Sequence, residues 1–160
     1  MDAAGGGDFT GIQEAIDAVK PHDILEVAPG VYPEASTADL DFATTNVILA
    51  FDKGLTLRGT GPEEVVIESA IDTLTPTNGS YGLVFDDAAT RVVIEGLTVD
   101  HGIRGAASSY AWYAGMSSEP EAVGSLDMSH VVFRMDATNY GKILLRANSC
   151  LLYTSDAADE

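Results

Sequence analysis

The sequence predicts an all-β solenoid, a right-handed parallel β-helix with an α-helix that caps its N-terminal end. Three observations support this fold class. One amphipathic helical stretch lies near the N-terminus, short strand-forming segments fill most of the rest, and several of these segments resemble one another at a period of about 40 residues. A regular period of this kind is typical of proteins that stack one structural unit on the next.

The helix is expected within residues 1–22, which form the predicted cap. Apolar residues recur there at helical spacing and give one apolar stripe. The members of the stripe are Ile12, Ala15, Ile16 and Val19. Thr10 and Gln13 have the spacing of a capping box, and Pro21 is expected to end the helix. Because so short a helix is not stable alone, the stripe is expected to cover the open core of the first coil.

Short strands are expected from residue 23 onward. The candidate segments are rich in β-branched residues and leucine, and Gly, Asp, Asn or Pro bound them. They are DILEVAPGVYPE, NVILA, GLTLRGTG, EVVIES, GLVFDD, RVVIEGLTVDHG, HVVFRM and KILLRA. Apolar cores of two or three residues suit the narrow layers of a solenoid better than the longer strands of a sandwich. An incomplete β-helix is therefore expected over residues 23–149.

The predicted repeat rests on three resemblances between segments. GLTL at 54–57 recurs as GLTV at 96–99, which is 42 residues later. TNVI at 45–48 recurs as TRVV at 90–93, and SHVVF at 129–133 resembles the latter again. Two turns of roughly 20 residues each would account for the period and give about three coils. The right hand follows the general rule for parallel crossovers.

The last eleven residues, CLLYTSDAADE at 150–160, resemble a translated transposase adapter from sequencing libraries. They are treated as a non-native scar, so the natural sequence is expected to break off near Ser149. The chain's single cysteine, Cys150, lies in this tail. The rest of the chain therefore has no residue for a disulfide, a cysteine nucleophile or a thiolate metal site.

The chain is strongly acidic, with 25 Asp and Glu, 8 Lys and Arg, and a formal net charge of −17. A surface of this sign repels phosphate groups, so neither nucleic acid nor an anionic membrane is an expected partner. The sequence has no apolar run of membrane-spanning length, so membrane insertion is not expected. No cofactor is required. Calcium is a candidate ligand, and a solvated acidic surface is the simpler alternative.

The chain opens with GDFT at 7–10, IQEAI at 12–16 and PGVYPE at 29–34, and it continues with GLTLRGTG. These motifs resemble the opening of right-handed parallel β-helix proteins of the pectin-lyase-like class, above all the pectin methylesterases. The resemblance covers residues 4–70 and, more loosely, 80–101. It implies a secreted, periplasmic or cell-surface protein that acts on polysaccharide, either pectinesterase-like or lyase-like, although no signal peptide is visible.

The resemblance assigns no catalytic residue. The catalytic motifs of the pectin methylesterases match no segment of this chain, and IDTL at 71–74 lacks the family's Gln and comes too early. Catalytic residues are expected beyond Ser149, so the fragment itself is expected to be inactive on pectin. The alternatives are a non-catalytic β-helical surface or adhesion protein and a carbohydrate-binding module.

Acidic residues at strand ends are candidate ligand residues. Asp86 and Asp87 follow one predicted strand, and Asp100 and His101 follow another. Carboxylates from neighbouring coils suit calcium, which makes Asp86, Asp87 and Asp100 the metal candidates. The alternative is that each Asp caps the backbone of a turn.

Aromatic residues in a predicted loop insertion near 102–122 are candidates for sugar binding. Tyr110, Trp112 and Tyr113 offer flat apolar faces on which a sugar ring can stack, and Asp100 and His101 complete the proposed substrate site. The alternative is that the aromatic rings pack the loop against the coil. Self-association is also expected, through the open C-terminal coil near Leu144 and Leu145.

Overall fold

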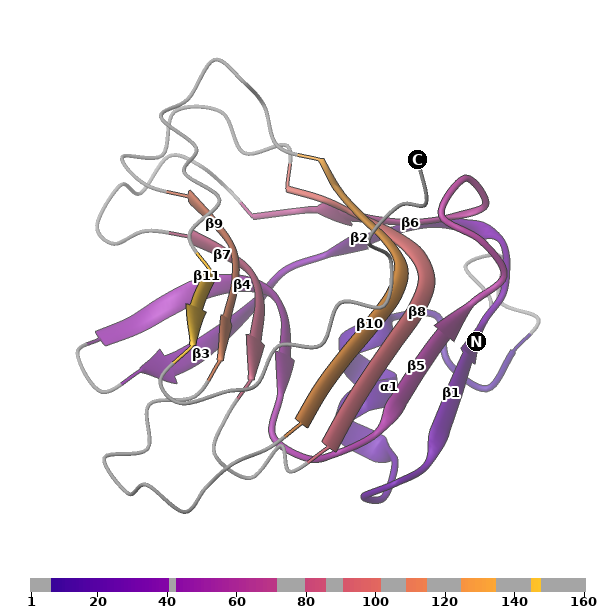
Figure 1. Cartoon of the computed structure of the whole chain (residues 1–160), viewed down its shortest axis with the longest axis horizontal. Coiled ribbons are helices and arrows are strands. Elements are labelled where there is room, and N and C mark those ends of the chain that lie inside the picture. Colours follow the sequence, from indigo (N-terminus) through magenta and orange to yellow (C-terminus); the bar gives the residue numbers. More distant parts are fainter. Residues whose placement is uncertain are drawn as a thin grey trace, which may run out of the picture.

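The computed structural model describes residues 7–40, 43–71, 80–85, 91–101, 109–114, 125–134 and 145–147 (Figure 1). The described chain is mostly β, with one short helix, as predicted for the fold class. The elements are α1 (Ile12–Ala18), β1 (Ile24–Val27), β2 (Gly30–Glu34), β3 (Ser36–Leu40), β4 (Ala43–Phe51), β5 (Thr56–Gly59), β6 (Val65–Ser69), β7 (Ser80–Phe85), β8 (Arg91–Asp100), β9 (Ser109–Ala114), β10 (Ser125–Arg134) and β11 (Leu145–Ala147).

The first sheet is parallel and curls around one side of the molecule (Figure 1). Its strand order is β1-β5-β8-β6-β2, and β10 pairs with β8. The long strand β8 serves both halves of the sheet, because residues 93–95 pair with β5 and residues 98–100 pair with β6. Gly96 has φ +67 and His130 has φ +52. These left-handed residues occupy matching places in β8 and β10 and mark the bend of each strand.

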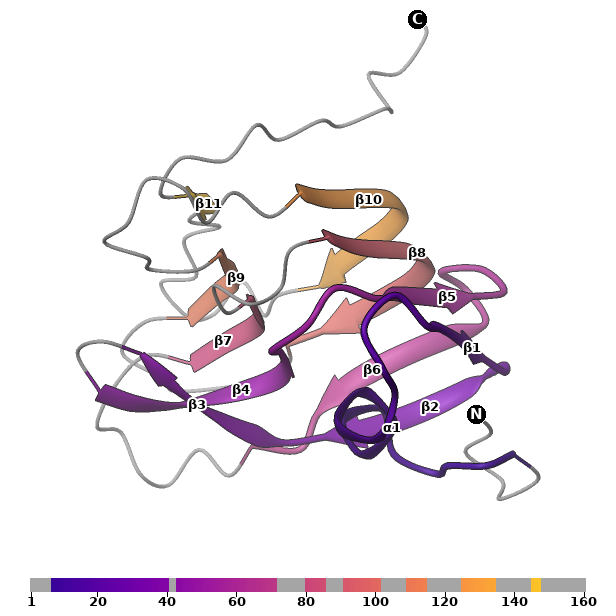
Figure 2. The ribbon, with the colours of Figure 1, turned by 90° about the horizontal axis from the view of Figure 1, so that it is seen from below.

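The second sheet has the order β11-β9-β7-β4-β3. Its pairs are parallel except β3 with β4, which form an antiparallel pair at one end. Seen from below, the strands of both sheets are stacked from the side of α1 and β2 toward the side of β10 and β11 (Figure 2). Strand β9 lies inside the predicted insertion at 102–122. Residues 109–114 therefore continue the sheet and do not loop out, because their backbone pairs with β7 and β11.

The predicted repeat of about 40 residues is wrong in length and in alignment. The residues of a parallel pair are separated by 29 to 37 positions in the sequence. The smallest separation is between Ser80 and Ser109, and the largest is between Thr56 and Val93. Leu57 pairs with Ile94, which is 37 residues later, and not with Val99, the partner that the predicted alignment gives. The error arose because similar short apolar motifs occur in both halves of the bent strands.

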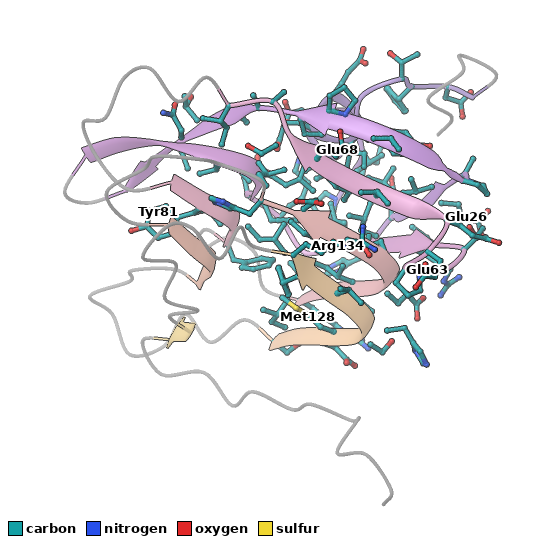
Figure 3. The ribbon with its side chains drawn as sticks, turned by 90° about the horizontal axis from the view of Figure 1, so that it is seen from above. Glu26, Glu63, Glu68, Tyr81, Met128 and Arg134 are labelled. Atoms are coloured by element: carbon teal, nitrogen blue, oxygen red, sulfur yellow. The ribbon has the colours of Figure 1, made fainter. Side chains whose placement is uncertain are left out.

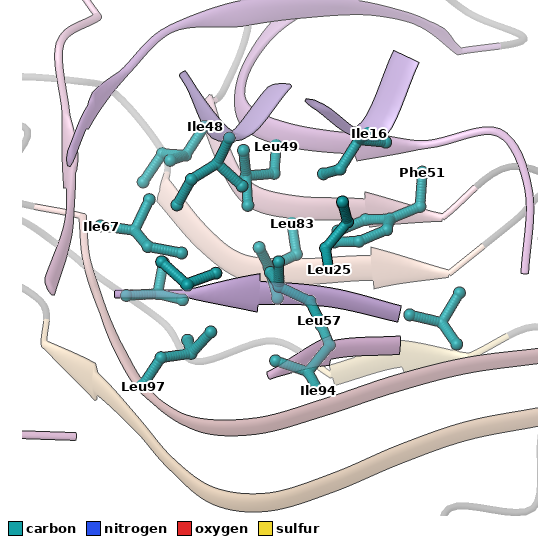
Figure 4. Close-up of a cluster of buried hydrophobic side chains, with 14 of the residues drawn as sticks. Ile16, Leu25, Ile48, Leu49, Phe51, Leu57, Ile67, Leu83, Ile94 and Leu97 are labelled. Atoms are coloured by element: carbon teal, nitrogen blue, oxygen red, sulfur yellow. The ribbon is translucent and has the colours of Figure 1, made fainter. Parts of the chain in front are cut away.

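The main core lies between the two sheets and is built from rows of apolar side chains in register (Figure 4). Leu25, Leu57 and Ile94 form one such row across β1, β5 and β8. Phe51 of β4 and Phe85 of β7 stack with their ring centroids 5.0 Å apart. Each row repeats the same kind of side chain from strand to strand, so apolar area is buried between layers as well as within them.

The apolar stripe of α1 enters this core, as predicted. Ile12, Ala15 and Ile16 are fully buried, and the helix packs against β2 and β4. At the C-terminal end of the helix, Lys53 Nζ donates to the carbonyl oxygens of Ile16 and Asp17 at 3.2 Å. A cation at this position is favoured by the partial negative charge of a helix C-terminus.

The predicted capping box is absent, and the helix ends earlier than predicted. Gly11 is the N-cap residue and provides no side-chain cap, and the last helical residue is Ala18 rather than one next to Pro21. The free amides of the first turn instead meet a carboxylate from β2, because Glu34 accepts hydrogen bonds from the backbone N–H groups of Ile12 and Gln13. This cap connects residues 22 positions apart, so local spacing does not reveal it.

A second, smaller apolar cluster belongs to the second sheet. Val47, Tyr81 and Val84 are buried there, and Ala38 and Ala50 pack against them. In the described ranges, no helix is long and apolar enough to cross a membrane.

Candidate functional site

A row of ionisable side chains crosses the outer face of the curled sheet where β6, β8 and β10 end. Glu68 is in register with Asp100, and Asp100 is in register with Arg134. Because side chains alternate between the two faces of a strand, these three point away from the buried residues Ile67 and Val99 that precede two of them. We call Glu68, Asp100 and Arg134 the strand-end row. Figure 3 shows Glu68 and Arg134 among the other side chains.

The strand-end row is accessible at both ends. Glu68 and Arg134 are exposed, whereas Asp100 between them is half-buried. Two carboxylates flanked by one guanidinium provide several hydrogen-bond acceptors and a fork of donors within reach of one ligand. Such a set suits a ligand rich in hydroxyl groups.

The structure places the predicted pair Asp100 and His101 on different sides of the sheet. His101 is only 3% exposed, whereas Asp100 lies on the outer face. The His101 backbone N–H donates to the carbonyl oxygen of Arg134 at 2.9 Å, which extends the ladder between β8 and β10. Asp100 therefore belongs to the accessible row, and His101 belongs to the interior behind it.

A second charged row crosses the same face on the other side of the bend. Glu26, Arg58 and Glu95 are in register across β1, β5 and β8. The Arg58 Nε donates to the Glu95 carboxylate, and their side chains are 47% and 30% exposed. This hydrogen bond with Glu95, together with the charges of Glu95 and Glu26, raises the pKa of Arg58 above its ordinary value. The Arg58 guanidinium is therefore already engaged by acidic side chains of the same sheet.

The bend between the two rows is closely packed. The Thr98 hydroxyl donates to the Pro62 carbonyl oxygen at 2.6 Å, which ties β8 to the turn between β5 and β6. The Gly61 N–H donates to the Gly96 carbonyl oxygen at 3.0 Å. A Cβ at Gly59 would lie 2.2 Å from that same oxygen, so the backbones meet too closely for any side chain. These contacts fix the two charged rows relative to each other.

The proposed calcium residues are only partly described. Asp86 and Asp87 lie outside the described residues, so the structure does not give their distances to Asp100. Within the ranges that the structure describes, no group of three or more His, Cys, Asp or Glu side chains could hold a metal ion. Calcium binding remains a prediction from the sequence.

The three aromatic candidates lie in β9, and only their backbone is described. Tyr110 and Tyr113 are in register with Tyr81 and Val84 of the second apolar cluster. Trp112 is in register with Leu83, which belongs to the main core. The register thus gives the backbone neighbours of these aromatics, and sugar binding by their rings stays a prediction from the sequence.

Sequence reasoning missed Glu68, Arg134 and the row of Arg58. The alternation in VVIES at 65–69 already indicates that Glu68 faces outward when Val65 and Ile67 face inward. The missing information was the register of β6, β8 and β10, which decides that their outward residues lie side by side.

Comparison of the chain with protein-family models, with curated proteins and with solved structures finds no match in any of the three.

Proposed function

We propose that this chain is a right-handed parallel β-helix that binds polysaccharide along the outer face of its curled sheet. The fold part of the proposal is supported by the recurring order of the strands. Strands β1, β2 and β4 are followed by β5, β6 and β7, and each member of the second set is a parallel neighbour of its counterpart in the first. The two halves of β8, followed by β9, repeat the order again. Right-handed connection is the general rule for such crossovers.

The position of α1 also supports a β-helix. The helix packs against β2 and β4, which belong to the first set of strands, and its apolar stripe is buried in the main core. A stack of coils needs such a cover at its first layer, because that layer has no neighbour on one side. The resemblance of residues 4–70 to pectin-lyase-like proteins is in keeping with this arrangement.

The strand-end row is the single observation that carries the binding proposal. Neighbouring strands lie about 4.8 Å apart, so Glu68, Asp100 and Arg134 present acceptors and donors at regular steps across the face. A carboxylate accepts hydrogen bonds from sugar hydroxyls, and a guanidinium donates to hydroxyl or uronate oxygens. The row is accessible and lies on regular strands, so a linear sugar chain can lie across it without rearrangement of loops.

Binding to a panel of immobilised neutral and uronate polysaccharides would test the proposal. Asp100→Asn keeps the size of the side chain and removes its charge, and we expect it to weaken retention about tenfold relative to the unsubstituted protein. Glu63→Gln is the matched control, because Glu63 is an exposed acid in the turn between β5 and β6 and lies outside the row. Equal retention of the two variants, or no retention of the unsubstituted protein on any polysaccharide, would refute binding at this row. Product release would identify an esterase or lyase, and binding without product would favour a carbohydrate-binding or adhesion role.

A further inference from the structure

Strand β10 is the last described strand at one end of the first sheet. Among the described strands it pairs with β8 alone, and it lies at the opposite end of the first sheet from α1 (Figure 2). The carbonyl oxygen of Arg134 accepts from the His101 N–H, so the backbone of Arg134 faces β8. Backbone groups of successive strand residues point to opposite edges, so those of Phe133 point away from β8.

The apolar row of β10 is incompletely buried where the corresponding row of β8 is fully buried. Ile94, Leu97 and Val99 of β8 have no exposed area. Their register partners in β10 are only partly buried, although they pack against the main core. These partners are Met128, Val131 and Phe133. On the outer face Val132 is 41% exposed. Within the described residues, the apolar row of β10 therefore has no apolar neighbour on the side away from β8.

The sequence of β10 is complementary to itself in the antiparallel direction. The left-handed residue His130 interrupts the alternation, so Asp127 before it and Arg134 after it are both exposed on the outer face. Met128 and Phe133 both lie on the inner face, against the core. An antiparallel pairing that sets residue 127 opposite residue 134 also sets 128 opposite 133. Charge then meets opposite charge outside, and apolar residue meets apolar residue inside.

We propose that this edge binds a second copy of the chain, β10 against β10, about a two-fold axis near His130. In this arrangement Asp127 of each copy lies opposite Arg134 of the other, and Met128 lies opposite Phe133. A two-fold axis along the bisector of the bend relates each bent strand to its reversed counterpart, so the inner faces of both strands lie on the same side of the joined sheet. The pairing satisfies the backbone groups that β10 presents at the edge where no described strand pairs with it.

A second copy suits the edge better than an unrelated strand. The complementary residues all lie in β10, so a two-fold pairing of β10 with itself forms each contact twice, once from each copy. The opposite end of the first sheet is where α1 packs, so the same pairing does not repeat there. A closed dimer is therefore expected, and not an open filament. The inference does not depend on the polysaccharide proposal.

Charge reversal in the whole chain would test the pairing. Sedimentation velocity over a concentration series should show a monomer–dimer equilibrium for the unsubstituted protein. Asp127→Arg sets Arg against Arg twice in the dimer, and Arg134→Asp sets Asp against Asp twice. Each variant alone should raise the dimer dissociation constant about tenfold or more. An equimolar mixture of the two variants should recover the dimer, because both pairs are then of opposite charge.

Two further variants keep the test decisive. Glu63→Arg reverses an exposed charge away from β10 and should leave the dissociation constant unchanged. Val132→Lys places a charge on the exposed part of the edge and should abolish the dimer, with far-ultraviolet circular dichroism confirming that the chain is folded. A monomer at every soluble concentration, assembly beyond a dimer, or failure of the mixture to recover the dimer would overturn the proposal.

Discussion

The Glu34 carboxylate caps the first turn of α1 by accepting hydrogen bonds from the backbone N–H groups of Ile12 and Gln13. Glu34 is 7% exposed and lies at the end of β2. The contact replaces a local cap by one from the first sheet, so the helix depends on β2 for its N-terminal hydrogen bonds.

Replacement of Glu34 by alanine should destabilise the protein. The change removes the acceptor of the Ile12 and Gln13 backbone N–H groups, and the hydrogen bond to Ile12 is buried. A buried donor left without an acceptor costs about 1–3 kcal/mol. Urea unfolding followed by circular dichroism would measure the loss. Glu64→Ala is the control, since Glu64 is an exposed acid for which a change within about 0.5 kcal/mol is expected. Similar effects of the two substitutions would contradict the capping role.

The ionisation of Glu34 should make its contribution to stability decrease as pH rises. Burial raises the pKa of Glu34 above its ordinary value of 4.5, and the carboxylate of Glu14 adds to the shift, whereas the hydrogen bonds from Ile12 and Gln13 oppose it. The folded state therefore holds this proton more tightly than the unfolded state. The resulting stabilisation is complete below the unfolded pKa and is lost as pH rises through the folded pKa.

A comparison with Glu34→Gln would isolate this effect, because the amide does not titrate. The unfolding free energy of the unsubstituted protein minus that of the variant should decrease between about pH 4 and pH 7. Urea titrations at several pH values would give this difference. A difference that grows with pH would mean that the helix amides outweigh burial and that the folded pKa lies below 4.5.

The Gln13 side chain should tolerate neither truncation nor charge. Its Oε1 accepts from the Ala50 N–H at 2.8 Å, and its Nε2 donates to the Ala50 carbonyl oxygen at 3.1 Å. Gln13→Glu keeps the shape but sets a carboxylate against that carbonyl and near Asp17, whose carboxylate now accepts from Nε2. We expect Gln13→Glu to cost about 1–3 kcal/mol and more at pH 7 than at pH 4, as measured by urea unfolding. A neutral effect would show that the amide bridge between α1 and β4 contributes nothing.

Gly59 at the end of β5 and Gly61 in the turn that follows should respond differently to alanine. A Cβ at Gly59 would overlap the Gly96 carbonyl oxygen, and that atom belongs to backbone that cannot move aside. A Cβ at Gly61 would meet nothing within 4 Å. Gly59→Ala should therefore cost about 1–3 kcal/mol or more, and Gly61→Ala should change stability by less than about 1 kcal/mol. Thermal unfolding of the two variants would show whether the contact at the bend is as close as described.

The sequence was sufficient for features that depend on local periodicity. The apolar stripe of α1 is buried as predicted at Ile12, Ala15 and Ile16, and the predicted β segments coincide with strands wherever the structure describes them. Both features follow from the spacing of apolar residues, which determines the buried side of a helix or strand whatever the element packs against.

Features that depend on contacts between distant residues could not be predicted. Thr10 and Gln13 had the spacing of a capping box, but Glu34 reaches the same amides from β2. Similar motifs at 54–57 and 96–99 suggested one alignment of the layers, whereas the register pairs Leu57 with Ile94. In both cases a contact between strands overrides a local signal that has only a small energetic advantage.

The candidate site also depends on contacts between strands that the local sequence does not reveal. Asp100 was identified from its place at a strand end, and the structure adds Glu68 and Arg134 on either side of it. His101 shares the sequence signal of Asp100 but lies in the interior. Whether a strand-end residue faces solvent depends on the phase of alternation after the bend at Gly96, and a left-handed residue shifts that phase without a clear mark in the sequence.

The near-constant spacing of the parallel pairs has a consequence for the order of folding. Every described parallel pair joins residues between 29 apart, as in Ser80 with Ser109, and 37 apart, as in Thr56 with Val93. Loop-closure entropy changes little over this range, so each added layer meets a similar entropic barrier. A chain leaving the ribosome can complete its first layer, with α1 in place, before the strands that cover it have been synthesised. Folding would then advance along the chain in step with translation, from the N-terminus toward β10.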